Sequence, residues 1–294
     1  MWSVPYALIW DDLRERWGAQ FTAEERSPWD ALGDARLVEC NGCALHYFDP
    51  PMPGGSMYYE VLSRHPEYYV DDRWEFGVVL DTIRPGDTVV DFGSGEGAFL
   101  RGAAAVAGRV VGCDHNVGAA PTDVGGAELR HEPFDIVADA IAGGADVATS
   151  FHVLEHLANV DDLCLPATTA LRAGGRLFLA TPDRDRSVRN DLESLDCPPH
   201  HVSRWSARQY EVLADRYGYD LVSVRHEPFV HVHGVRRLVP KPLLHRAAIV
   251  RHRRRGFTVH GRDSVSAPPW PRGSALLAEL VKRSGVRRRR LESI

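Results

Sequence analysis

The chain has 294 residues, of which 44% are hydrophobic, 26% charged and 9% aromatic. This composition predicts a globular protein with one large domain or one core domain and modest appendages, and it excludes a disordered chain. No run approaches the roughly 18 consecutive apolar residues of a membrane-spanning helix. The five cysteines are scattered and odd in number, which argues against a disulfide framework and predicts a cytoplasmic location.

The net charge of −5 is unevenly distributed along the chain. Residues 236–294 carry 16 basic and three acidic residues, a net charge of +13, which leaves −18 for residues 1–235. A basic tail of this kind binds a polyanion or packs on an acidic body. Because Lys241 and Lys282 are the only lysines, the arginine runs reflect composition bias and are weak evidence for nucleic acid. We expect neither a nucleic-acid nor a membrane partner.

Residues 1–85 are expected to form an N-terminal cap. Apolar residues recur with helical spacing within residues 1–39, and two short strands, 37–40 and 44–48, flank an Asn-Gly turn. Residues 58–83 are largely helical in pattern, with a break near Pro66. Cys40-x-x-Cys43 lies in the hairpin, and a single Cys pair cannot complete a four-ligand zinc site, so we expect a metal-free hairpin.

Residues 86–235 are expected to form the core, an α/β domain with a Rossmann-like, doubly wound parallel sheet. Buried-type strands alternate with helices there, as βαβ units require. The strands are expected at 88–92, 109–114, 145–150, 175–180 and 220–224, and the helices at 98–107, 160–171 and 206–217. We place no strand in residues 236–294, the arginine-rich C-terminal extension.

A glycine-rich loop follows the first strand of the core. Gly93, Gly95 and Gly97 have the spacing G-x-G-x-G, which differs from the G-x-G-x-x-G of dinucleotide sites. Glycines here allow a tight turn and a close approach of the backbone to a ligand. Asp114 ends the second strand, where its carboxylate can accept hydrogen bonds from ribose hydroxyls. Asp91, ahead of the glycines, suits the cationic amino group of a methionine moiety better than a pyrophosphate.

Residues 89–97 resemble motif I of the class I S-adenosylmethionine (SAM)-dependent methyltransferases, and Asp114 matches their ribose-binding acid. Residues 150–157 are similar to the fourth motif of that family, and the likeness covers about residues 86–225. The resemblance implies SAM as the cofactor. The cofactor-binding residues that it implies are Asp91, Gly93, Ser94, Gly95, Gly97, Asp114, His115, Phe134, Phe151, His152 and Tyr59. Packing of the cap on the core is the alternative role for Tyr59.

Two strings of histidines stand out. His152-x-x-Glu155-His156 matches the H-x-x-E-H pattern of some zinc peptidases, but it begins at a strand end and not on a long helix, so we do not expect a peptidase. Residues 198–206, with the pattern P-P-H-H-x-x-x-W-S, are similar to a string in a branch of small-molecule methyltransferases. In that branch the string lies over the acceptor pocket.

A metal ion is an alternative role for these histidines. Resemblance to small-RNA 2′-O-methyltransferases implies His152, Glu155, His156 and His201 as the ligands. His152 stands where that family has Glu, and imidazole favours Zn, Fe or Ni over Mg. The other alternative is that these side chains form ordinary hydrogen bonds and packing contacts. We therefore do not favour a divalent metal.

Methyl transfer to a hydroxyl group needs alignment of donor and acceptor and a base for the hydroxyl proton. Histidine titrates near neutral pH, so His200 or His201 is the expected base, with His152 and His156 on the pocket wall. The expected activity is SAM-dependent O-methylation of a small metabolite of natural-product or sugar type. The alternatives are a metal-assisted RNA 2′-O-methyltransferase and a non-catalytic SAM-binding protein. The loop spacing disfavours a nicotinamide-dependent oxidoreductase.

Overall fold

The computed structural model describes residues 2–69, 72–114, 123–186, 193–227, 258–259 and 275–284. The chain divides into two compact units whose segments alternate along the sequence. Unit 1 takes in Met1–Tyr68, Pro182–Ser206 and His226–Ala275, and unit 2 takes in Tyr69–Thr181, Ala207–Arg225 and Leu276–Ile294. The consecutive division into cap, core and extension at 1–85, 86–235 and 236–294 stays a prediction.

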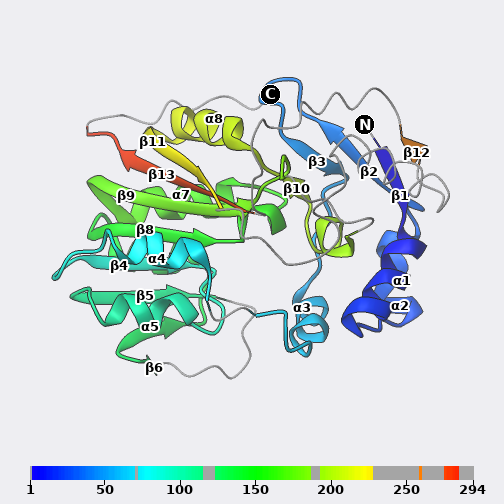
Figure 1. Cartoon of the computed structure of the whole chain (residues 1–294), viewed down its shortest axis with the longest axis horizontal. Coiled ribbons are helices and arrows are strands. Elements are labelled where there is room, and N and C mark those ends of the chain that lie inside the picture. The colour runs from blue at the N-terminus through cyan, green and yellow to red at the C-terminus, as the bar shows by residue number, and fades with distance from the viewer. Residues whose placement is uncertain are drawn as a thin grey trace, which may run out of the picture. The chain divides into compact units, whose positions relative to one another are not determined.

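Unit 2 is built on an eight-stranded sheet with the order β11-β13-β9-β8-β4-β5-β7-β6, which can be followed from top to bottom in Figure 1. Its strands are β4 (Thr88–Phe92), β5 (Arg109–Cys113), β6 (Asp123–Val124), β7 (Ala127–Arg130), β8 (Ala145–Phe151), β9 (Leu171–Pro182), β11 (Tyr219–His226) and β13 (Ala275–Lys282). The four pairs that join β9, β8, β4, β5 and β7 are parallel, and β6 runs antiparallel to β7. The predicted mixed α/β fold with a largely parallel sheet is confirmed.

Helices cover both faces of this sheet. They are α4 (Trp74–Leu80), α5 (Ala98–Ala104), α6 (Phe134–Ile141), α7 (Asp161–Ala170) and α8 (Ala207–Tyr217). Val89 of β4 packs in one core cluster with residues of α4 and α5. Its neighbour Val90 is fully buried and points to the other face, because side chains alternate along a strand, and on that face α7 contacts β4 and β8. Burial on both faces explains the continuous apolar runs in the central strands.

Unit 1 contains a second sheet, which is antiparallel, and helices that pack on it. Its strand order is β10-β3-β2-β1-β12, with β1 (Trp2–Pro5), β2 (Asp34–Glu39), β3 (His46–Asp49), β10 (Ser203–Arg204) and β12 (Thr258–Val259). The hairpin expected around the Asn-Gly turn is confirmed as β2 and β3. The helices are α1 (Tyr6–Trp17), α2 (Ala23–Asp30) and α3 (Ser56–Ser63). A core rich in aromatic side chains joins these helices to the sheet.

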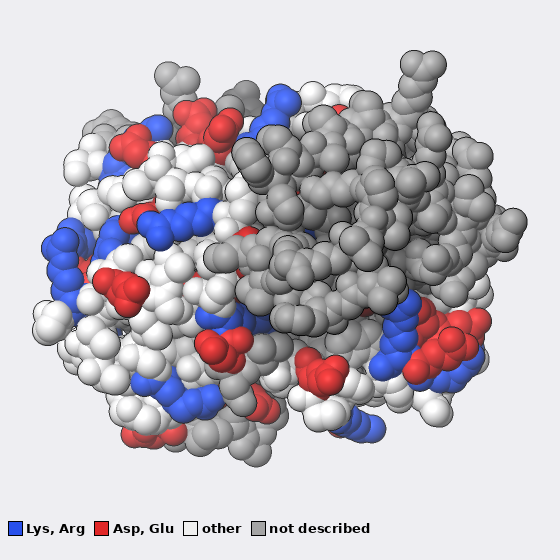
Figure 2. Space-filling model, viewed as in Figure 1, with Lys and Arg blue, Asp and Glu red and all other residues white. Residues whose placement is uncertain are grey.

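Among the described residues, no helix is long and apolar enough to cross a bilayer. On the face shown in Figure 2, the acidic and basic side chains of the described residues are interspersed. The arginine runs at 251–255 and 287–290, which dominate the charge of the predicted extension, lie outside the described residues. The structure therefore adds nothing to the expectation about a polyanion partner.

The strand β13 lies in the segment where the sequence pattern predicted no strand. It is inserted between β9 and β11, and Leu277 belongs to the same core cluster as Val89. We expect Leu277→Ala, at a side chain only 2% exposed, to lower the free energy of unfolding by about 2–5 kcal/mol. Val222→Ala on β11, 56% exposed, is the control and should change it by about 0.5 kcal/mol or less. Denaturant unfolding measures both, and equal effects would contradict a buried β13.

Candidate active site

The glycine loop at the carboxyl end of β4 is tied to the end of β5. The backbone N–H groups of Gly93 and Ser94 donate to the carbonyl oxygen of Cys113 at 2.8 and 3.1 Å. The N–H of Gly95 donates to Oδ2 of Asp114 at 3.0 Å. These three hydrogen bonds fix the loop relative to Asp114. The two features that the sequence singled out, the glycines and the acid on the next strand, are thus one structural element.

The glycines at 93 and 97 are required by their backbone angles and by the space around them. Their φ angles are +77° and +80°, which disfavour any residue with a Cβ atom. A Cβ at Gly93 would lie 2.3 Å from Cγ2 of Val153, and one at Gly97 would lie 2.9 Å from Cγ1 of Val124. Side chains at these positions would displace the loop.

Asp91 is a buried acid at the carboxyl end of β4. The register between β4 and β8 places it opposite Thr149, whose hydroxyl group donates to Oδ1 of Asp91 at 2.7 Å. Burial, with a smaller contribution from Asp114, raises the pKa of Asp91 to about 7, although the hydrogen bond from Thr149 opposes the shift. A ligand cation beside this carboxylate would favour its charged form. Asp91 is therefore suited to an ammonium group.

Tyr69 lies against the glycine loop and was not singled out from the sequence. Its ring carbon Cε1 would be 3.4 Å from a Cβ atom at Gly95. Burial and the charges of Asp114 and Glu96 raise the pKa of its hydroxyl group to about 12, so the side chain stays neutral. No local motif marks this tyrosine, since it lies more than twenty residues before the loop that it contacts.

His152 is held between two buried glutamates. Its Nε2 lies 2.7 Å from Oε1 of Glu75 on α4, and its Nδ1 lies 3.4 Å from Oε1 of Glu155. Burial alone would lower the pKa of the imidazole, but the two carboxylates raise it above its ordinary value. Burial likewise opposes the charge of Glu75, but His152 holds the pKa of that carboxyl group below its ordinary value. Both ring nitrogens of His152 therefore face carboxylates, and its predicted place on the pocket wall stays a prediction.

The turn at His152 is strained. The residue has φ +57°, in the left-handed region, and its N–H donates to the carbonyl oxygen of Ala180 at 2.9 Å. Strain of this kind persists only where surrounding contacts hold the backbone in place. The pair of glutamates supplies such contacts, and Glu155 lies in the short 3-10 helix η1 (Leu154–His156), which also contains His156. His152, Glu155 and His156 are thus neighbours at the end of β8.

The remaining cofactor-binding candidates of unit 2 have different surroundings. Phe134 begins α6 and packs edge-on against Phe92, with ring centroids 5.5 Å apart. The ring of Phe151 packs against Phe99 with the centroids 4.9 Å apart, in the core on the α4 and α5 face. The hydroxyl oxygen of Ser94 is buried and has no hydrogen-bond partner among the described residues. His115 lies outside the described residues.

The other two histidine candidates, His200 and His201, belong to unit 1. His200 has Nδ1 at 2.9 Å from the carbonyl oxygen of Leu195 and Nε2 at 3.2 Å from the hydroxyl oxygen of Tyr68. Its ring also contacts Tyr59, with the centroids 6.1 Å apart. The structure thus places the candidate Tyr59 in unit 1, beside His200. The rings of His200 and His201 are adjacent, with centroids 4.5 Å apart.

His201 is oriented by a carboxylate. Its Nδ1 lies 3.6 Å from Oδ1 of Asp196, which also forms ion pairs with Arg186 and with Arg204, the latter at 3.7 Å. Burial opposes the charge of Asp196, but Arg186 and then His201 and Arg204 hold its pKa well below the ordinary value. Asp196 stands five residues before His201, and no motif in the sequence marked it as a partner of that histidine.

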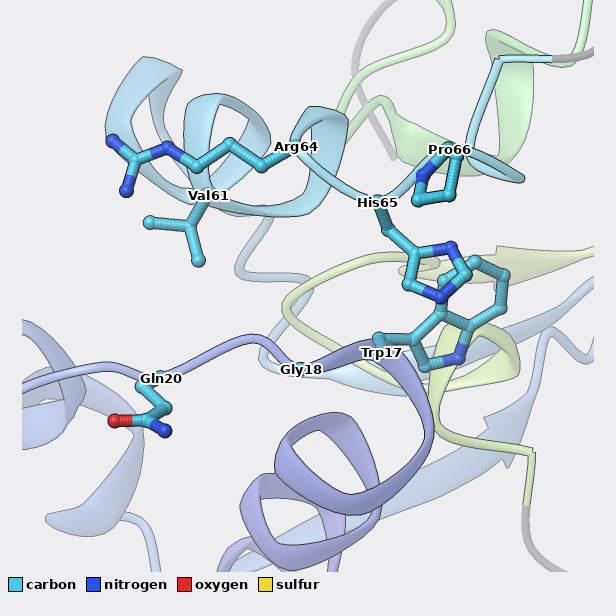
Figure 3. Close-up of a pocket in the computed structure, with 7 residues that line it drawn as sticks. All are labelled: Trp17, Gly18, Gln20, Val61, Arg64, His65 and Pro66. Carbon is cyan, nitrogen blue, oxygen red and sulfur yellow. The ribbon is translucent and has the colours of Figure 1, made fainter.

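Unit 1 also contains a cavity of about 480 Å³ between the end of α1 and the end of α3. It is lined by Trp17, Gly18, Gln20, Val61, Arg64, His65 and Pro66. Figure 3 shows the imidazole of His65 beside the indole of Trp17, and their ring centroids are 5.0 Å apart. None of the residues that the sequence nominated for catalysis or cofactor binding lines this cavity.

Comparison with known proteins identifies the family. A family model described as a methyltransferase domain matches residues 62–224. Ubiquinone biosynthesis O-methyltransferase from Sinorhizobium medicae (strain WSM419) is 31% identical over 207 residues, which cover 66% of this chain and 74% of that protein. The protein of the same name from Sinorhizobium fredii is 30% identical over 207 residues, with the same coverage. A solved structure of 1,6-didemethyltoxoflavin-N1-methyltransferase from Burkholderia thailandensis is 14% identical with a TM-score of 0.49, over 85% of this chain and 100% of that one.

The family match covers more than half of the chain, and it contains the glycine loop, Asp91, Asp114 and both strings of histidines. The central sheet of unit 2 has the alternation of parallel strands and helices that the sequence predicted for this family. The expected family and the expected cofactor are thereby confirmed. The chain belongs to the methyltransferase-domain family and is a class I SAM-dependent methyltransferase.

Proposed function

We propose that the protein transfers a methyl group from SAM to a hydroxyl group of a small metabolite. The observation that carries this proposal is the 31% identity, over 207 residues, with a protein named for O-methylation in ubiquinone biosynthesis. A carboxylate-oriented histidine, His201, adds support, because O-methylation of a hydroxyl group requires removal of a proton.

The glycine loop and its two acids are proposed to hold the cofactor. Asp91 fits the ammonium group of the methionine moiety, since its buried carboxyl group is ionised most readily beside a cation. Asp114, already bonded to the loop through Gly95, fits the ribose hydroxyls. Tyr69 packs on the same loop and would exclude water from it. When bound, SAM supplies an electrophilic methyl group on a sulfonium.

His201 is the better of the two candidate bases. An ionised Asp196 beside Nδ1 favours the tautomer with the proton on Nδ1, which makes Nε2 the proton-accepting nitrogen. In His200 the contact between Nδ1 and the Leu195 carbonyl oxygen also places the proton on Nδ1, but a neutral carbonyl group stabilises the imidazolium form less than the ionised Asp196 does. His201 would take the hydroxyl proton as the acceptor oxygen forms its bond to the methyl carbon. The bond between that carbon and the sulfonium sulfur would break, its electron pair would stay on sulfur, and S-adenosylhomocysteine would leave.

The role of Asp91 predicts a pH dependence of cofactor binding. Because the folded protein holds the pKa of Asp91 at about 7, the affinity for S-adenosylhomocysteine should fall below that pH, by up to about tenfold per pH unit. Asp91→Asn should bind weakly and lose this dependence. Thr149→Val should move the midpoint to higher pH, because the Thr149 hydrogen bond lowers the pKa. Calorimetric titrations between about pH 6 and 8 measure this, and an unchanged dependence in Asp91→Asn would contradict the assignment.

The role of His201 predicts a selective loss of turnover. His201→Gln should lower kcat by about 10²-fold or more, while the affinity for S-adenosylhomocysteine stays unchanged. Asp196→Asn should lower kcat as well, because the orienting charge is lost. His200→Gln should cost less.

The assay uses a panel of catechol, phenol and sugar acceptors, with product detection by mass spectrometry. Thermal melting shows whether each variant is folded. A folded His201→Gln enzyme with the rate of the wild type would exclude His201 as the base. Products methylated only on nitrogen or carbon would contradict the proposed O-methylation.

A further inference from the structure

Three arginines gather around the proposed base. Arg184, Arg186 and Arg204 line one small cavity of unit 1 together with Asp196 and His201. Their side chains are only 13%, 13% and 11% exposed. The chain brings Arg184 next to Arg204 because the segment after β9 bonds to the segment after β10, with the N–H of Arg184 donating to the carbonyl oxygen of Trp205 at 2.9 Å. The proposed catalytic chemistry does not use these guanidinium groups.

Uncharged neighbours hold two of the three guanidinium groups in place. Nη1 of Arg184 donates to the carbonyl oxygen of Ala44 at 2.7 Å. The guanidinium carbon of Arg204 lies 6.0 Å from the centroid of the Trp2 ring. A carbonyl group and an indole ring orient a cation but do not cancel its charge. These contacts therefore fix the positions of both guanidinium groups without neutralising their charge.

The carboxylates near the cavity are shared or otherwise engaged. The carboxylate of Asp196 is shared among ion pairs with Arg186, Arg204 and His201. The nearest carboxylate oxygen to Nε of Arg184 belongs to Asp185, which lies 3.8 Å away and is partly exposed. Among the residues that line the cavity, three guanidinium groups face one carboxylate.

Two further acids nearby have histidine partners. Asp183 lies 3.0 Å from Nδ1 of His226, and Glu39 lies 3.0 Å from Nε2 of His46. Burial lowers the pKa of Arg184 below its ordinary value in spite of the charges of Asp185, Glu39 and Asp183.

We propose that Arg184, Arg186 and Arg204 form a binding site for a carboxylate group of the methyl acceptor. The inference rests on the proposed function, because it is the acceptor of His201-assisted methyl transfer that would bring the anion to this cluster. The shared residue Asp196 links the two roles: it orients the imidazole of His201 and it positions Arg186 and Arg204.

The charge and the size of the cavity suit a small anionic group. Its volume is about 10 Å³, which is room for one oxygen atom the size of a water molecule. Guanidinium groups bind planar carboxylates through parallel hydrogen bonds, which makes the recognition directional.

The test compares two probes that differ only in charge, protocatechuic acid and its carboxamide. Calorimetry in the presence of S-adenosylhomocysteine measures the affinity of each for the wild-type protein, and we expect the acid to bind about tenfold tighter or more. Arg184→Gln should abolish that ratio, because it removes one of the three guanidinium groups that line the cavity. Arg36→Gln is the matched control: Arg36 is an exposed arginine of unit 1 that pairs with Asp49, and its loss should leave the ratio unchanged.

Equal binding of the acid and the amide by the wild type, binding of neither, or a ratio that survives in Arg184→Gln would overturn the inference. Unchanged affinity for S-adenosylhomocysteine shows that each variant is folded. Methyl transfer is measured in a separate assay, by mass spectrometry of the products. If hydroxyl groups are methylated with no preference for the acid over the carboxamide, the result supports the proposed O-methylation and contradicts the carboxylate site. If the acid binds through Arg184 and no acceptor is O-methylated, the result supports the carboxylate site and contradicts the proposed reaction.

Discussion

The hydrogen bonds between the glycine loop and the end of β5 fix the geometry at the carboxyl edge of the central sheet, where we propose that the cofactor binds. The carbonyl oxygen of Cys113 accepts from Gly93 and Ser94, and the Asp114 carboxylate accepts from Gly95. Since β4 and β5 are parallel neighbours, their carboxyl ends meet at one edge of the sheet, and the loop closes that edge. Tyr69 packs on the loop that these hydrogen bonds hold.

The buried ionisable side chains of His152 and Asp91, at this edge of the sheet, have different surroundings. The imidazole of His152 has both nitrogens facing glutamates, so its charge is balanced within unit 2. The hydroxyl group of Thr149 donates to Asp91, but no cation among the described residues of unit 2 forms an ion pair with it, and its pKa rises to about 7. A carboxylate left in this condition is suited to a cationic ligand. The assignment of Asp91 to the cofactor stays a proposal, and the predicted place of His152 on the pocket wall stays a prediction.

The parts of this structure that depend on neighbouring residues were predictable, and those that depend on tertiary contacts were not. The glycine spacing and the strand ends located Asp91 and Asp114, because the turn and its ligand contacts are encoded within a few residues. Glu75 reaches His152 from a helix 77 positions earlier, and no local pattern marks such a pair. The strand Ala275–Lys282 is rich in Ala, Leu and Glu, which favour helix, and its pairing within the sheet overrides that preference.

We propose above all that the glycine loop after β4, together with Asp114 at the end of β5, binds SAM. Calorimetric titration with S-adenosylhomocysteine of the wild type, of Asp114→Ala and of Asp139→Ala tests it most directly. Asp139 is an exposed acid on α6 and serves as the matched control. The account predicts dissociation constants of about micromolar size for the wild type and the control, and a loss of about tenfold or more for Asp114→Ala. Equal binding by all three proteins, or no binding by the folded wild type, would contradict it.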